Sequence, residues 1–173
     1  CRPDDLSTVG QLQLDPRLNG LPISAHSKVD ERTGEFLFFA YGKEPPYMHY
    51  GVMDRFGKLQ TFIPVPLPGP RLPHDMAITE HYSILHDFPL WPDEEALKAR
   101  RYKVRFHPET PSRFAVIPRY GAAGDIRWFT AKPGYMLHVV NAWEEGTRGE
   151  EVIVMVGTPY RIHTTAIGEI DAR

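Results

Sequence analysis

Short apolar runs separated by Gly, Pro and Asp turns predict a chain built mainly of β-strands. The run EFLFFAY at 35–41 follows a turn, and the runs at 48–53 and 58–65 flank DRFG, a hairpin turn in which Gly57 can adopt positive φ. Further strands are expected at 77–86, 113–118, 125–130, 135–143 and 151–156. Strands spaced every 8–20 residues or so favour an all-β sandwich, barrel or propeller.

One segment has a helical pattern, PDEEALKARR at 92–101. Its Pro suits a first turn, and its acidic residues come before its basic residues, an order that complements the helix dipole. Because a helix of this length is marginal by itself, we expect a short surface excursion between strands. The basic run at 98–105 is interpreted as a solvated face. The Pro-rich segment at 63–73 is interpreted as a rigid crossover rather than a docking peptide.

The composition narrows the classes of function. Twenty Lys and Arg against 22 Asp and Glu give a formal net charge of −2, which disfavours a general nucleic-acid binder. The single Cys excludes an internal disulfide framework and a Cys-based zinc site. No apolar run approaches the roughly 18 residues of a membrane-spanning helix, and the first ten residues lack the apolar run of a signal peptide. We therefore expect a reducing, cytoplasmic compartment.

Three of the eight histidines lie at the edges of predicted strands. His26 precedes the run at 35–41, His74 ends the Pro-rich segment, and His138 lies within the apolar run at 135–143. They are too far apart for one hairpin, but their spacing suits one ligand from each supersecondary unit. A metal on a central axis, with one imidazole from each sheet, would need such spacing. The sequence also lacks the G-x-S-x-G, H-E-x-x-H, Walker and dinucleotide-binding motifs.

The other polar residues near these histidines are interpreted as structural. His81 and His86 would face opposite sides of one strand at 77–86 and could not share a metal. Asp75 alternates to the face opposite His74 and is not expected as a ligand. The remaining structural histidines are His49 and His107.

Three motifs resemble the carotenoid cleavage oxygenase family, which includes the lignostilbene dioxygenases. The first is AHSKVDERTGE at 25–35, the second is PGP at 68–70 followed by PHDMAITE at 73–80, and the third is LHVVNAWEE at 137–145. They stand in the family's order and spacing. The likeness extends from about residue 20 to residue 156.

The resemblance implies a seven-bladed β-propeller that holds a non-haem Fe(II) with four His. His26, His74 and His138 match the first three ligands. The context of His163 does not match the fourth, which is expected outside this chain together with the supporting Glu residues. Residues 1–173 are therefore expected to be an incomplete middle portion of a propeller and a poor catalyst alone. Tyr135 is a candidate to line the substrate cavity.

The resemblance also implies that O2 is added across a C=C bond of a carotenoid, apocarotenoid or stilbene to give two carbonyl products. The partners are then a hydrophobic conjugated or aromatic substrate and O2, and any membrane contact is expected outside this segment. Four departures from the family pattern weaken a substrate assignment: Ser27, Pro73, Met76 and Leu137. The alternatives are a same-family isomerase, a non-catalytic propeller binding module, and a three-His zinc hydrolase, which the motif context disfavours.

Overall fold

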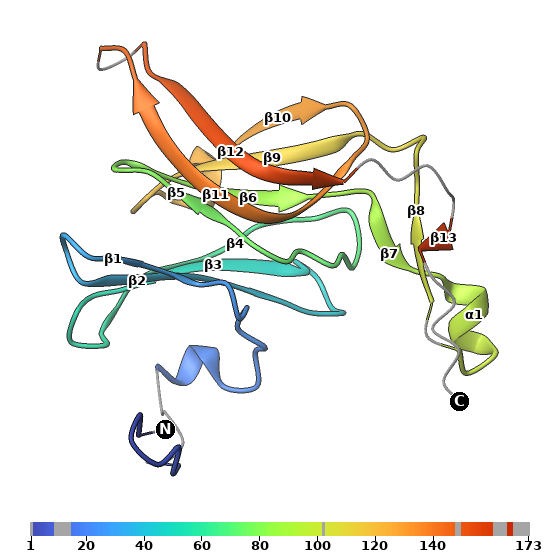
Figure 1. Ribbon diagram of the computed structural model, residues 1–173, viewed down its shortest axis with the longest axis horizontal. Helices are drawn as coiled ribbons and strands as arrows, with labels where there is room; N and C mark the ends of the chain where they lie inside the picture. The colour runs from blue at the N-terminus through green and yellow to red at the C-terminus, as the bar shows by residue number, and fades with distance from the viewer. Residues whose placement is uncertain (1, 9–14, 102, 148–149, 161–165, 168–173) are drawn as a thin grey trace.

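The computed structural model describes residues 2–8, 15–101, 103–147, 150–160 and 166–167 of the chain. In this part the fold is mostly β, with one short α-helix, α1. Figure 1 shows a first sheet stacked on a second, with a long two-stranded ribbon crossing beside the second sheet. No helix among the described residues is long and apolar enough to cross a membrane.

The first sheet is a four-stranded antiparallel meander in the order β1-β2-β3-β4. Its strands are β1 (Lys28–Asp30), β2 (Glu35–Tyr41), β3 (Met48–Met53) and β4 (Leu59–Pro64). The expected strands at 35–41 and 48–53 are confirmed at these bounds. The DRFG hairpin also forms, because Asp54 Oδ1 accepts the N–H of Phe56 at 2.9 Å and Gly57 has φ +78°. A 3₁₀ turn, η1 (Pro16–Leu18), precedes this sheet.

The second sheet has the order β10-β9-β6-β5. Its strands are β5 (Ala77–Ile78), β6 (Tyr82–Asp87), β9 (Ser112–Pro118) and β10 (Arg127–Ala131), and the 3₁₀ turn η2 (Ala123–Asp125) precedes β10. The prediction of one strand at 77–86 was wrong. The Thr79 N–H donates to the Tyr82 carbonyl at 2.8 Å, so the chain reverses between β5 and β6. His81 therefore lies in an exposed turn and His86 lies buried in β6.

The helical excursion is inserted between β6 and β9. Strands β7 (Leu90–Pro92) and β8 (Val104–Phe106) flank α1 (Glu94–Lys98), and β13 (Ala166–Ile167) pairs with β8. Asp93 caps the helix by accepting the N–H of Ala96 at 3.0 Å, so α1 begins at Glu94. The helix ends at Lys98 and is shorter than the predicted 92–101. Most basic side chains of the run at 98–105 are exposed, as expected, and one, Lys103, is half-buried; the exposed ones are Lys98, Arg100, Arg101 and Arg105.

Strands β11 (Tyr135–Glu145) and β12 (Val152–Tyr160) form a separate antiparallel ribbon. Both are longer than the predicted runs at 135–143 and 151–156. The register shifts on both sides of Val139, which marks irregular pairing in the middle of β11. This ribbon also contacts β5, so it lies next to one end of the second sheet.

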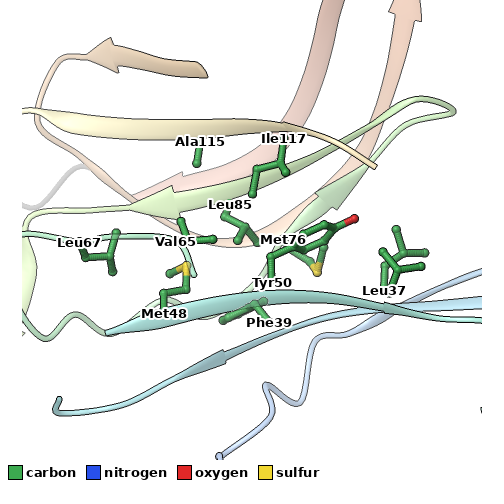
Figure 2. Packing of buried hydrophobic residues seen from close by; sticks show 11 residues of the cluster. Leu37, Phe39, Met48, Tyr50, Val65, Leu67, Met76, Leu85, Ala115 and Ile117 are labelled. Carbon is green, nitrogen blue, oxygen red and sulfur yellow. The ribbon is translucent and has the colours of Figure 1, made fainter. Parts of the chain in front are cut away.

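The main core fills the space between the first and second sheets (Figure 2). Tyr50 of β3 is fully buried there, and its hydroxyl lies 2.7 Å from the Ser83 hydroxyl and 3.1 Å from the Arg119 carbonyl. The Pro-rich crossover contributes buried Val65 and Leu67 to the same core. Its prolines at 64, 66, 68 and 70 are exposed, and Pro73 is buried. The crossover is thus a fixed connection between β4 and β5, as predicted.

Candidate metal centre

Three imidazoles converge at one point, two from segments that lead into different sheets and one from the β11–β12 ribbon. His26 lies two residues before β1, His74 lies three residues before β5, and His138 lies within β11. The ring centroids are 4.4 Å apart for His26 and His74, 5.0 Å for His26 and His138, and 5.1 Å for His74 and His138. One ring nitrogen from each residue lies within 4.8 Å of the other two. The fold therefore brings together all three histidines that the sequence analysis selected.

Ser24 ties the His26 turn to the segment that carries His74. Its hydroxyl accepts the backbone N–H of His26 at 3.1 Å and donates to the backbone carbonyl of His74 at 3.3 Å. Ser27, which stands where the family pattern has Pro, donates from its hydroxyl to the Ser24 carbonyl at 3.0 Å. This hydrogen bond helps to close the turn around His26, so the lost ring constraint of Pro is partly replaced.

His138 is placed by the irregular pairing of β11 with β12. Its N–H donates to Thr158 Oγ1 at 3.1 Å, and the Thr158 hydroxyl donates back to the His138 carbonyl at 3.3 Å. Gly157 makes the close approach possible, because a Cβ at this position would overlap the side chain of Met136. A side-chain hydroxyl and a glycine thus replace regular ladder pairing where the exposed imidazole projects.

The surroundings of His74 favour its neutral imidazole. Burial is the main cause that lowers the pKa of His74, and the neighbouring His26 and His138 lower it further, whereas Asp75 opposes them. A neutral ring keeps a nitrogen lone pair free for a metal. Burial alone would raise the pKa of Asp75. Hydrogen bonds from Lys28 and from backbone N–H groups outweigh that effect, so its pKa lies below the ordinary value and it stays ionised.

The three nitrogens fit one metal ion. Nitrogens bound to one ion at about 2.1 Å in tetrahedral geometry lie about 3.4 Å apart. Ring nitrogens that lie within 4.8 Å of one another therefore need an inward movement on the order of 1 Å to bind one ion. A donor set made only of imidazole suits iron, zinc, copper or nickel. The arrangement is a candidate metal centre whose donors alone do not select the element.

Comparison with known proteins decides the family. The family model of RPE65, the retinal pigment epithelial membrane protein, matches residues 1–170. The chain belongs to the carotenoid cleavage oxygenase family. It is 39% identical over 153 residues to a carotenoid 9,10(9',10')-cleavage dioxygenase from Crocus sativus, covering 87% of this chain and 27% of that protein. It is 38% identical over 149 residues to isoeugenol monooxygenase from Pseudomonas putida, covering 84% of this chain and 31% of that protein.

Solved structures of carotenoid cleavage oxygenases agree with the fold. The lignostilbene dioxygenase of Pseudomonas brassicacearum matches with a TM-score of 0.75 and 33% identity, covering 88% of this chain and 32% of that one. Cobalt-substituted Synechocystis apocarotenoid oxygenase matches with a TM-score of 0.64 and 27% identity, covering 80% of this chain and 30% of that one. These structures are seven-bladed β-propellers, which confirms the expected fold class. The chain spans about a third of their length.

The carboxylates near the histidines in sequence bind other groups. Glu80 pairs with Arg32 at 2.9 Å, and Glu144 accepts the backbone N–H and ring Nδ1 contact of His81, both at 2.8 Å. Glu145 accepts the Trp143 indole N–H at 2.7 Å. None of these contacts is made with the three converging rings, and the source of any supporting Glu residues stays a prediction.

Tyr135 was predicted to line the substrate cavity, and His163 was judged not to match the fourth ligand. The Tyr135 ring packs edge-to-face on Phe88 with centroids 5.6 Å apart, and its hydroxyl donates to the Leu72 carbonyl at 3.4 Å. Its role in substrate binding stays a prediction. His163 lies outside the described residues. What the sequence analysis missed is the contact between Lys28 and Asp75, although both residues lie within the ligand motifs.

Proposed function

We propose that the protein carrying this chain is an Fe(II)-dependent dioxygenase that cleaves a C=C bond of a carotenoid, apocarotenoid or stilbene with O2. The bond is replaced by two carbonyl groups, so each product takes one oxygen atom. The convergence of three imidazoles from three separate segments of the chain carries the proposal. Relatives named carotenoid 9,10(9',10')-cleavage dioxygenase and isoeugenol monooxygenase support the substrate range.

In this proposal His26, His74 and His138 hold the iron, together with a fourth His from outside the chain. Bound iron would supply activation of O2 at coordination positions that the imidazoles leave open. The chain's own contribution is to keep three ring nitrogens aimed at one point. The lowered pKa of His74 serves this purpose, because an imidazole that resists protonation remains a ligand as the pH falls.

Tyr135 is proposed to line the substrate path on the side of the second sheet. Its ring and that of Phe88 form an edge-to-face pair, and its hydroxyl is held by the Leu72 carbonyl, two residues before His74. An aromatic surface of this kind suits a conjugated chain or a phenyl ring. A Tyr135→Leu variant, which removes the aromatic ring, is expected to raise KM while leaving the metal content unchanged. An equal fall in metal content would contradict a role confined to substrate.

The test uses the natural gene product that carries these residues. It is purified with its metal and supplied in parallel with an apocarotenoid, a hydroxylated stilbene and isoeugenol under ¹⁸O2. The proposal predicts O2 uptake in step with cleavage and ¹⁸O in both carbonyl products. Bound zinc without O2 uptake would refute it. Double-bond isomerisation without cleavage would establish the isomerase instead.

A further inference from the structure

A single buried carboxylate joins the three segments that carry the converging histidines. The Asp75 side chain is 2% exposed. Its Oδ1 lies 2.7 Å from Lys28 Nζ and accepts the Met76 N–H at 2.7 Å. Its Oδ2 accepts the Val139 N–H at 2.8 Å.

The Asp75 carboxylate and its partners Lys28 and Val139 lie within two residues of the three converging histidines. Lys28 lies two residues after His26, Asp75 itself follows His74, and Val139 follows His138. One carboxylate thus reaches the neighbourhood of every imidazole in the cluster. Ser24 provides a second connection, but it links only the His26 and His74 segments.

The irregular pairing of β11 explains why the backbone N–H of Val139 needs an acceptor from outside the ribbon. The β11-β12 register shifts immediately before and immediately after this residue. Irregular pairing weakens the control that a regular ladder exerts over strand position. The Asp75 carboxylate supplies a fixed acceptor for the Val139 N–H from outside the ribbon, directly beside His138.

The ion pair between Lys28 and Asp75 is not expected to contribute much to the free energy of folding. Burying a carboxylate against an ammonium costs desolvation that the pair's attraction often fails to repay, and an apolar pair of similar volume is frequently as stable. A more specific benefit is geometric, since a carboxylate with three donors at 2.7–2.8 Å fixes the segments that supply them.

We propose that Asp75 and Lys28 are positioning residues that set the separation of the three imidazoles and thereby the affinity of the centre for its metal. The proposal rests on the proposed function only in taking the three histidines as ligands of one ion. Groups that orient metal ligands typically change affinity by about 10–100-fold when removed.

The test measures Co²⁺ binding and the visible absorption of the Co²⁺-loaded natural gene product, with its melting temperature measured in parallel. Asp75→Asn and Lys28→Met are each expected to weaken Co²⁺ binding by about 10–100-fold and to change the spectrum. Because the two residues act through one contact, the double variant is expected to lose less than the product of the single losses. Lys28→Arg keeps the cation and is expected to recover most of the affinity.

The control is the ion pair between Arg32 and Glu80, which also joins the first and second sheets but is 63% and 58% exposed. Arg32→Met is expected to leave Co²⁺ affinity and spectrum unchanged. Folded variants of Asp75 and Lys28 with wild-type affinity and spectrum would overturn the proposal. If Asp75→Asn does not fold, Lys28→Met decides, because Lys28 is 28% exposed and its removal leaves the packed core in place. A wild-type protein that binds no Co²⁺ would instead refute the proposed metal site.

Discussion

Arg119 connects the first and second sheets through a buried cation, and its removal should destabilise the fold strongly. The side chain is 4% exposed, and its Nη1 lies 2.6 Å from Asp30 Oδ2 and 3.2 Å from Glu35 Oε2. Its Nη2 donates to the Thr79 carbonyl. One guanidinium thus binds β1, β2 and the turn after β5.

The magnitude follows from what Arg119→Met leaves behind. Asp30 and Glu35 have side chains only 12% exposed and would lose their shared cation. Breaking a buried ion pair by removing one partner costs about 3–5 kcal/mol. Since both carboxylates retain some contact with water, we expect a loss near the lower end of this range, about 3 kcal/mol.

The loss should also depend on pH. The hydrogen bond from Arg119 is the main cause that lowers the pKa of Asp30 from 3.8. A lowered carboxyl pKa contributes stability that is complete above the ordinary value and disappears as the pH falls through the lowered one. The difference between wild type and Arg119→Met should therefore be full at pH 7 and should shrink as the pH falls below the ordinary value.

Urea denaturation followed by tryptophan fluorescence measures both effects. Arg32→Met is the matched control, since the Arg32–Glu80 pair spans the same sheets at the surface and should contribute less than about 1 kcal/mol. An equal loss in the two variants, or a loss from Arg119→Met that does not change with pH, would refute the reasoning.

Three further substitutions test the packing. Tyr50→Phe leaves two buried hydrogen-bond partners unsatisfied between the sheets and should cost about 1–3 kcal/mol by urea denaturation; an unchanged midpoint would contradict it. Burial lowers the pKa of His86 from 6.5 to about 4. The free energy of unfolding should therefore fall as the pH drops from 6.5 towards 4. His86→Leu should remove roughly 3 kcal/mol of that fall. Gly51→Ala would place a Cβ against the buried Phe38 ring and should lower the melting temperature, whereas Gly42→Ala, with open space around it, should not.

Much of the fold follows from local pattern. The continuous apolar run at 35–41 and the DRFG turn predict their strands and hairpin, and the structure confirms them. The short strands β1, β7 and β8 escape such reasoning, because each has only three residues and is held by a neighbour rather than by its own periodicity. The break between β5 and β6 was also missed, since the turn is closed by a backbone hydrogen bond between Thr79 and Tyr82 and by the Thr79 hydroxyl, which accepts the Tyr82 N–H.

The sequence predicted the three histidines of the candidate site but not the residues that hold them in place. His26, His74 and His138 stand in motifs whose order identifies them, and the structure brings their rings together. Asp75 was not expected as a ligand, and its contact with Lys28 was not foreseen. A contact between residues far apart in sequence leaves no local periodicity, and only the stacking of two sheets against a ribbon brings these side chains together.

The most direct test of the central claim is the metal content of the natural gene product and of its single variants His26→Ala, His74→Ala and His138→Ala. The account predicts one iron per wild-type chain and loss of iron from each folded variant, together with loss of O2 uptake. Full iron retention in any one of the three variants, or zinc in place of iron in the wild type, would contradict it.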